Sequence, residues 1–232
     1  MASIYLVRHG QAGFFKLNYD QLSDLGHRQS ELVGKALAVR GVEAHKVIHG
    51  KMQRHKETMQ GAQKHWHSYG TVIEDANFNE FDSDEIIAKA FPKFANKAAL
   101  GAWLSTKSNK RRAFQDLFIE AIERWVSGKF DADYVESWPA FHQRVVTGLE
   151  TLIQNGNGKD IVVFTSGGPI SVMAQHCLGL TAEKAFELNW TILNGSISQL
   201  LFSSKNPDRI SLAGFNEQHH LSLSGSKFIT YR

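Results

Sequence analysis

The chain has few of the features that mark secreted, membrane-bound or nucleic-acid-binding proteins. It contains one cysteine in 232 residues, which excludes an internal disulfide and fits a reducing compartment. No apolar run approaches the ~20 residues that cross a membrane, and Arg8 and His9 interrupt the apolar start that a signal peptide would need. The formal net charge of +3 gives no case for nucleic-acid binding and slightly favours small anionic ligands. We therefore expect a cytoplasmic protein that binds neither membranes nor nucleic acids.

The hydrophobic content is high enough for a sizeable core. Apolar residues make up 42% of the chain, and its length fits one large α/β domain, with or without a subdomain. Short apolar runs predict strands at residues 4–7, 46–49, 71–74, 160–164, 195–202 and 210–215. Apolar residues at helical spacing predict helices at 23–41, 51–69, 138–155 and 182–188.

The first predicted strand ends in the sequence Arg8-His9-Gly10. An arginine offers a fixed fork of donors that matches two phosphate oxygens, and a histidine can act as a nucleophile or proton carrier near neutral pH. A glycine allows a sharp turn and the close approach of a ligand. Because open α/β sheets bind ligands at the carboxyl ends of their strands, this placement predicts an anion site at His9. A buried histidine that merely ends a strand is the alternative.

The second predicted strand ends at Gly50, and Arg54 lies in the first turn of the helix that follows. An arginine there can aim its guanidinium group at an anion that the helix N-terminus already favours. We therefore predict that Arg54 binds the same anion as His9. An exposed helical arginine among other charges is the alternative.

The third predicted strand is followed by the sequence NFNEFD, residues 77–82. A carboxyl group between two aromatic residues can keep its proton and serve as a general acid. We assign this role to Glu80, with Asp82 and Asp84 as the alternatives.

The strand at 160–164 leads into the sequence TSGGP, residues 165–169. A proline at a helix start with two glycines before it is typical of an anion-binding helix N-terminus. Ser166 and Gly167 are therefore candidate substrate-binding residues. Ser166 does not fit a serine-hydrolase nucleophile, because that motif needs a glycine two residues before the serine and Phe164 stands there.

These strand-end motifs, in this order, resemble the histidine phosphatase superfamily, the phosphoglycerate-mutase-like group. The resemblance covers residues 3–82 and 138–221. It implies a three-layer α/β/α sandwich with a mainly parallel sheet, and a single domain over residues 1–232. Residues 82–137 resemble the family least, are helical by pattern, and are expected to form an insertion that caps the pocket and sets substrate choice.

The resemblance also implies a role for each motif residue. His9 becomes phosphorylated during turnover, Arg8 and Arg54 hold the phosphoryl group, and Glu80 is the general acid. No metal and no cofactor is expected. The predicted substrate-binding residues are Gln11, Ser166, Gly167 and His220, with packing as the alternative role of His220.

The chain departs from the family pattern at several positions. Ser166 stands where a second catalytic histidine donates a hydrogen bond to the phosphoryl oxygens, and Gly50 stands where serine is usual. Losing such a donor raises a reaction barrier by ~2.7–4 kcal/mol, which leaves room for a slow or a redesigned enzyme. Phe15 replaces a phosphoryl-binding asparagine, for which Asn18 is the substitute candidate, and Phe14 and Phe15 are candidates for a pocket wall.

The predicted insertion carries a basic cluster that has two interpretations. Such a run is usually a solvated helix face, and it can also form a rim that attracts phosphorylated substrates. The cluster consists of Lys107, Lys110, Arg111 and Arg112.

The preferred function is metal-independent hydrolysis of a phosphate monoester, on a small molecule or a phosphorylated peptide, through a phosphohistidine at His9. A catalytically weakened phosphate-ester binding protein is the alternative that Ser166 favours. A phosphoglycerate-type mutase would share the first step and return the phosphoryl group to product. A protein-interaction scaffold that uses the helical insertion is a further alternative. The sequence carries no signal for an oligomeric state.

Overall fold

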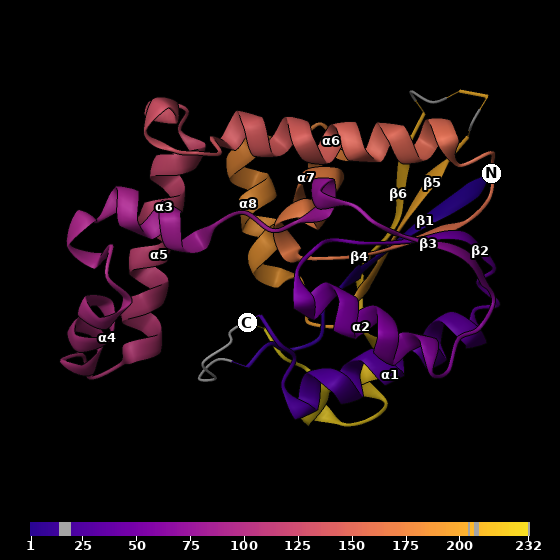
Figure 1. The fold of residues 1–232 in the computed structure, drawn as a ribbon, viewed down its shortest axis with the longest axis horizontal. Coiled ribbons are helices and arrows are strands. Elements are labelled where there is room, and N and C mark those ends of the chain that lie inside the picture. The colour runs from indigo at the N-terminus through magenta and orange to yellow at the C-terminus, as the bar shows by residue number, and fades with distance from the viewer. Residues whose placement is uncertain (14–19, 204, 207–208, 232) are drawn as a thin grey trace. The chain divides into compact units, whose positions relative to one another are not determined.

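The computed structural model describes residues 1–13, 20–203, 205–206 and 209–231 (Figure 1). Phe14, Phe15 and Asn18, three residues that figured in the sequence predictions, lie outside the described residues. The chain divides into two compact units. Unit 1 comprises Met1–Glu80 and Val145–Arg232, and unit 2 comprises Phe81–Arg144.

The described part of unit 1 is built on a six-stranded sheet with the order β3-β2-β4-β1-β5-β6. The strands are β1 Ala2–Arg8, β2 Ala44–His49, β3 Tyr69–Glu74, β4 Ile161–Thr165, β5 Ile197–Phe202 and β6 Ser211–Glu217. The strands β1 to β4 pair in parallel, whereas β5 pairs antiparallel with both β1 and β6. This mainly parallel sheet confirms the predicted fold class.

Helices cover both faces of the sheet, as a three-layer sandwich requires. In unit 1 they are α1 Asp24–Val39, α2 Gln53–Gln63, the last part of α6 Trp138–Asn155, α7 Gly167–Leu178, α8 Ala182–Thr191 and α9 His219–Ser222. Figure 1 shows α1 and α2 on one side of the sheet, and α7 with the end of α6 on the other. Helix α8 packs against α7, and α9 contacts α1. No helix among the described residues is long and apolar enough to span a bilayer.

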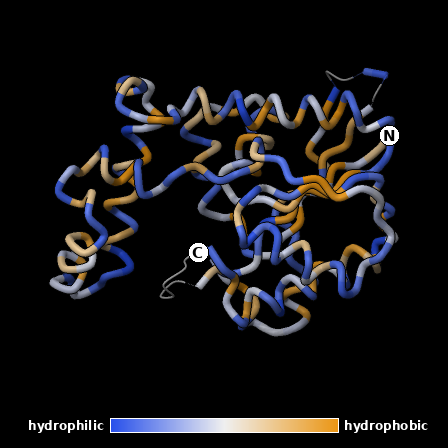
Figure 2. The backbone as a smooth tube through the Cα atoms, viewed as in Figure 1, coloured by the Kyte–Doolittle hydropathy of each residue, from blue (hydrophilic) through white to orange (hydrophobic). Residues whose placement is uncertain are grey.

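The core of unit 1 lies on both faces of the central strands, because successive side chains of a strand point to opposite faces. Tyr5 and Val7 of β1 join a hydrophobic cluster that includes Leu37 of α1. Ile4 and Leu6 alternate with them along β1 and are also buried. Figure 2 shows the hydrophobic segments gathered where the strands cross the middle of unit 1. Burial on both faces explains why the central strands β1 and β4 have continuous apolar runs in the sequence.

Unit 2 is helical and has an aromatic core of its own. Its helices are α3 Ser83–Ala90, α4 Lys97–Ser105, α5 Lys110–Val126 and the first part of α6. The ring of Trp125 lies 5.2 Å from Phe81, 5.3 Å from Trp138 and 5.6 Å from Phe141, measured between centroids. Unit 2 contains the segment that the sequence analysis assigned to an insertion, and its role as a cap stays a prediction.

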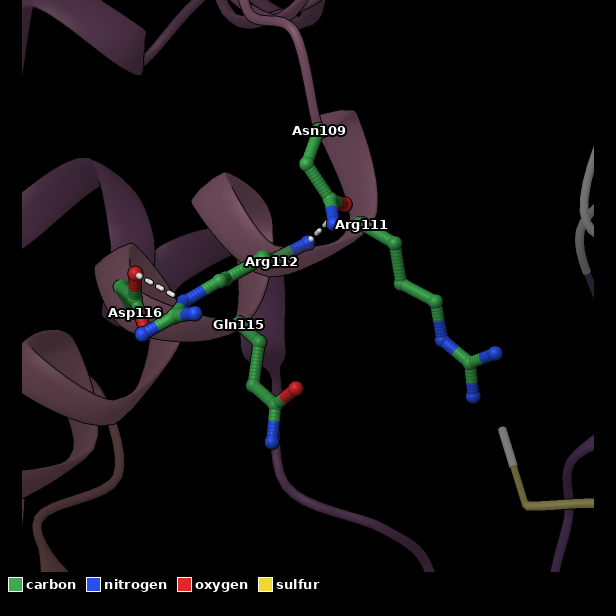
Figure 3. Close-up of a pocket in the computed structure, with 5 residues that line it drawn as sticks. All are labelled: Asn109, Arg111, Arg112, Gln115 and Asp116. Carbon is green, nitrogen blue, oxygen red and sulfur yellow. Dashed lines mark hydrogen bonds and ion pairs between the residues drawn. The ribbon is translucent and has the colours of Figure 1, made fainter.

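The start of α5 in unit 2 carries a shallow hollow of about 370 Å³ (Figure 3). The side chain of Asn109 accepts a hydrogen bond from the backbone of Arg112 over 3.0 Å, and the Arg112 guanidinium lies 3.9 Å from the Asp116 carboxylate. The Arg111 side chain extends away from the other lining residues in Figure 3. An exposed ion pair of this kind is typical of a solvated helix face and contributes little to stability.

Candidate active site

The parallel strands of unit 1 end at one edge of the sheet, and this edge collects the predicted site residues. The backbone N–H of His9 donates to the Thr165 carbonyl over 2.9 Å, and that of Gly50 donates to the Phe164 carbonyl over 3.1 Å. These bonds join the first residues beyond β1 and β2 to the last two residues of β4. A ligand at the carboxyl ends of these strands therefore meets all three connections at once.

His9 is buried, with 7% of its surface exposed, and its two ring nitrogens have different partners. Nδ1 lies 2.7 Å from the Gly10 carbonyl oxygen and so donates to it. Nε2 accepts a hydrogen bond from Nε of Arg54 over 3.2 Å. Burial, followed by the nearby guanidinium groups of Arg54 and Arg8, lowers the pKa of His9 well below its usual 6.5. The imidazole is therefore neutral near pH 7, with the lone pair on Nε2.

Arg54 is the second residue of α2 and forms an ion pair with the carboxylate of Asp20. Its Nη1 lies 2.6 Å from Oδ1 of Asp20, and the other carboxylate oxygen of Asp20 accepts from the backbone N–H of Gln53 over 2.8 Å. The N-cap residue of this helix, Met52, makes no side-chain cap hydrogen bond. The Asp20 carboxylate thus marks a place where an anion meets a guanidinium group and a helix N-terminus together.

Arg8 ends β1 and is buried next to the loop that leads into β5. Its guanidinium donates to the carbonyl of Ile192. The same loop fixes the backbone at the site, because the Gly195 N–H donates to the carbonyls of both Arg8 and His9, over 3.0 and 3.2 Å. The side-chain amide of Asn194 also donates to the His9 carbonyl, over 3.3 Å. The backbone of His9 is thereby held by a loop that is distant in sequence.

Glu80 lies at the N-terminus of α7. Its Oε2 accepts from the backbone N–H of Gly168 over 3.3 Å. The N-cap residue, Ser166, makes no side-chain cap of its own. A carboxylate from the end of the β3 connection is therefore brought beside the start of the helix that follows β4.

The two alternatives to Glu80 are engaged within unit 2. The carboxylate of Asp82 caps α3, where it accepts from the backbone N–H groups of Asp84 and Glu85, both over 3.0 Å. The carboxylate of Asp84 pairs with Lys97 over 2.6 Å and is largely exposed.

Gln11 and Gly167 hold structural positions around the site. The Gln11 backbone N–H donates to the side chain of Gln29 over 2.8 Å, and its side-chain oxygen accepts from Ser23 over 2.9 Å. A Cβ at Gly167 would lie 2.3 Å from Oδ1 of Asn189. A side chain at position 167 would therefore displace the Asn189 side chain of α8.

His220 reaches the site through the backbone. Its Nε2 lies 2.9 Å from the carbonyl oxygen of Gly195, whose N–H in turn bonds to the His9 carbonyl. Burial lowers the pKa of His220, so the ring is neutral and donates from Nε2. The observed contacts of His220 are those of a residue that supports the Gly195 turn.

Sequence reasoning missed two side chains that touch the candidate site, Asp20 and His55. His55 follows Arg54 directly, is fully buried, and has its ring centroid 5.8 Å from that of His9. Its Nε2 lies 2.7 Å from Oγ of Ser166. The one available signal was a histidine next to the anion-binding arginine in the first turn of a helix. No sequence pattern pointed to Asp20.

No group of three or more histidine, cysteine, aspartate or glutamate side chains within the described ranges could hold a metal ion. Among the described residues, the guanidinium groups of Arg54 and Arg8 exert the strongest charge effects on the His9 imidazole. The chemistry that this arrangement supports is therefore attack by a neutral imidazole on an anionic centre that arginine side chains hold.

Comparison with known proteins identifies the family. The sequence matches the histidine phosphatase superfamily (branch 1) over residues 4–127 and 98–213. The chain belongs to the histidine phosphatase superfamily. This membership confirms the resemblance that the strand-end motifs indicated. No curated protein sequence matched the chain.

Solved structures of similar fold include three that carry phosphatase descriptions. A mycobacterial glucosyl-3-phosphoglycerate phosphatase is 19% identical, with a TM-score of 0.60 over 93% of this chain and 99% of its own. A candidate α-ribazole-5'-P phosphatase from Escherichia coli is 18% identical, with a TM-score of 0.63 over 94% and 98%. A variant of the phosphoserine phosphatase of Entamoeba histolytica is 15% identical, with a TM-score of 0.58 over 95% and 100%. These likenesses confirm the phosphoglycerate-mutase-like α/β fold.

Proposed function

We propose that this histidine phosphatase superfamily member hydrolyses phosphate monoesters through a phosphohistidine at His9, without a metal ion. The observation that carries the proposal is the contact between Nε2 of His9 and the Arg54 guanidinium, 3.2 Å apart in a buried site. An imidazole that stays neutral keeps its nucleophilic lone pair, and a guanidinium group beside that lone pair holds the anionic phosphorus centre where the attack occurs.

The residues divide the reaction into two balanced steps. Nε2 of His9 attacks phosphorus in line with the leaving oxygen, the P–O bond breaks, and Glu80 gives its proton to the departing alkoxide. Water then attacks phosphorus, Glu80 takes a proton back, and the P–N bond breaks to release inorganic phosphate. Arg8 and Arg54 neutralise the charge on the phosphoryl oxygens in both steps, and these oxygens replace Asp20 and Nε2 of His9 as acceptors for Arg54.

The substrate class is a phosphate monoester on a small molecule or a peptide. The three similar structures are described as phosphatases of a glucosyl-phosphoglycerate, a ribazole phosphate and phosphoserine, and a structure of the mycobacterial enzyme contains inorganic phosphate. These compounds share the phosphoryl group and differ in the leaving group. The residues of the site support binding of the phosphoryl group. A screen of a panel of phosphate monoesters would identify the preferred leaving group.

The first test is turnover of p-nitrophenyl phosphate in the presence of EDTA. We expect steady release of p-nitrophenol that the chelator does not slow. Binding of inorganic phosphate without any turnover would instead support the phosphate-ester binding protein, which is the alternative function that Ser166 favours.

The pH dependence of kcat/KM should follow the lowered pKa of His9. A protonated imidazole has no lone pair on Nε2, so activity is lost as the pH falls through the pKa of His9. Because that pKa lies well below the usual 6.5, the acid limb should fall below pH 6.5. An NMR titration of the His9 ring in the free protein checks the same value without the substrate, whose own phosphate titrates near pH ~6. A midpoint at or above 6.5 in both measurements contradicts the assignment.

Replacing Glu80 by glutamine should slow substrates according to their leaving groups. We expect kcat to fall by about 10²- to 10⁴-fold for an alkyl phosphate, whose alkoxide needs a proton, and by much less for p-nitrophenyl phosphate. Glu74→Gln is the matched control, because Glu74 is an exposed carboxylate at the end of β3. Equal losses for the two substrates would show that Glu80 is not the acid.

A further inference from the structure

His55 is a fully buried histidine that the proposed mechanism leaves unused. It comes from the first turn of α2, and its Nε2 lies 2.7 Å from the hydroxyl oxygen of Ser166 at the start of α7. A Cβ at Gly50 would lie 2.3 Å from Nδ1 of His55. Gly50 and Ser166 both depart from the family pattern, and both contact this imidazole. Their small side chains leave room for it.

His55 and Ser166 together have two hydrogen-bond donors, an N–H and an O–H. In either tautomer of His55, one of these two donors has no acceptor among the described residues. Burial, then Arg54 and His49, lower the pKa of His55, so its ring is neutral and carries a single N–H. Within the described chain Nδ1 has no partner. If the proton is on Nδ1, that N–H is unsatisfied, and if it is on Nε2, the ring donates to Ser166 and the serine O–H is unsatisfied. A buried donor without an acceptor is destabilising, so an acceptor supplied by a ligand is favoured.

Geometry decides which of the two donors a ligand can reach. Nδ1 of His55 faces the backbone of Gly50, where there is no space for a Cβ. Ser166 instead occupies the N-cap of α7 and does not use its side chain as a cap. Serine at this position usually accepts from the second or third helical N–H, but here the Gly168 N–H bonds to Glu80 and the third residue is Pro169. The Ser166 side chain therefore does not cap α7, and when Nε2 of His55 donates to Oγ, the serine O–H can donate to a ligand.

We propose that His55 and Ser166 together supply the hydrogen-bond donor that the family resemblance leads one to expect from a histidine at position 166. His55 donates from Nε2 to Oγ of Ser166, and the serine O–H donates to an oxygen of the phosphoryl group on His9. Ser166 is then the catalytic donor, and His55 is the residue that positions it. The contact forms when the phosphoryl group takes the place that the Arg54 guanidinium now fills beside Nε2 of His9. This inference rests on the proposed function.

Variants of the pair test the inference through kcat for p-nitrophenyl phosphate and through the Kd of orthovanadate. Ser166→Ala and His55→Phe should each lower kcat by about 100-fold or more, the scale for loss of one phosphoryl donor. The double variant should be no slower than either single variant, because the two residues act as one unit. His55→Gln should stay within about tenfold of the wild type, since the glutamine amide can donate where Nε2 does.

The controls separate this role from a structural one. Ser171→Ala removes a buried hydroxyl of the same helix, which bonds to the Gly168 carbonyl over 2.8 Å, and should leave kcat close to wild type. A purely structural pair would lower the free energy of unfolding of the variants while the folded protein kept its kcat and its orthovanadate affinity. That result, or losses that multiply in the double variant, overturns the inference.

The orthovanadate measurement also separates this inference from the proposed function. If the wild-type protein does not hydrolyse p-nitrophenyl phosphate, the proposed function fails, and the pair is judged by orthovanadate binding alone. The same pattern is then expected in Kd: both single variants weaken binding, the double variant is no worse, and His55→Gln is mild. Unchanged orthovanadate affinity in Ser166→Ala overturns the inference in either case.

Exchange of the donor between the two positions gives an independent check. Ser166→His alone should be slower than the wild type, because the new imidazole would occupy the space in which His55 now lies 2.7 Å from Oγ. Adding His55→Ala removes that overlap, and the double variant should recover a rate well above that of Ser166→His. A gain in rate from Ser166→His alone would show that the natural protein simply lacks a donor.

Discussion

Replacing His9 by alanine should reduce the release of p-nitrophenol by at least about 10⁴-fold, because no other group takes over from a lost covalent nucleophile. The hydrogen bonds of the His9 ring fix the tautomer that a nucleophile needs, with the lone pair on Nε2. The Gly10 carbonyl accepts a hydrogen bond from Nδ1–H, and the other nitrogen, Nε2, accepts one from Nε of Arg54. The variant should still bind orthovanadate, since both arginines remain.

His49→Ala is the matched control for this loss. His49 is a buried histidine at the end of the parallel strand β2, and its Nδ1 lies 2.9 Å from the carbonyl of the following residue, Gly50. It therefore reproduces the local hydrogen bond of His9 at the end of another parallel strand, separated from β1 by β4. We expect His49→Ala to keep most of the activity. Similar losses in the two variants would mean that buried strand-end histidines matter for folding and that His9 has no chemical role.

Replacing Arg54 by alanine should lower kcat/KM by about 10³-fold, with a parallel loss of orthovanadate affinity. The guanidinium group is placed by the first turn of α2, and its charge acts in a site from which water is largely excluded, where charge stabilisation is strongest. Arg54→Lys should recover only part of the loss, since an ammonium group keeps the charge and lacks the two-pronged geometry. The measurement is steady-state kinetics together with an orthovanadate titration.

Arg111→Ala provides the corresponding arginine control. Arg111 is also the second residue of its helix, α5, but its side chain is exposed in unit 2 and points away from the other labelled residues (Figure 3). A loss confined to Arg54→Ala supports the anion site at α2. A comparable loss in Arg111→Ala would instead support the interpretation of the basic cluster as a rim that attracts substrates.

The fold was predictable because most parallel strands of unit 1 carry two signals in the sequence, one in the strand and one directly after it. β1 and β4 are apolar runs that are buried along their whole length, whereas the edge strand β3 is largely exposed. Each parallel strand is followed by polar or small residues at the ligand-binding edge. The strand that precedes Arg8 and the helix that begins near Arg54 lie where the sequence patterns place them. The predicted helix at 51–69 is too long, because α2 ends at Gln63 and β3 begins at Tyr69. Residues 64–68 contain no proline or glycine that would mark the end of the helix in the sequence.

The site was predictable only where one segment carries the chemistry. Arg8 and His9 are adjacent in sequence, so their joint role is visible in one motif. The partner of Ser166 is 111 residues away, and nothing near Ser166 in the sequence indicates that His55 reaches it. The sequence therefore presented Ser166 as the loss of a donor, whereas the structure gives it a buried imidazole. Asp20 escaped detection for the same reason, since it lies 34 residues before Arg54 and meets it only in the folded chain.

The covalent intermediate tests the central claim most directly. Turnover of a phosphate monoester should be quenched under alkaline denaturing conditions, in which phosphohistidine survives, and the peptides analysed by mass spectrometry. The account predicts one added phosphoryl group on the peptide that contains His9, absent in His9→Ala and lost on mild acid treatment. A protein that turns over substrate with no such adduct, or with an acid-stable adduct on Ser166, would contradict it.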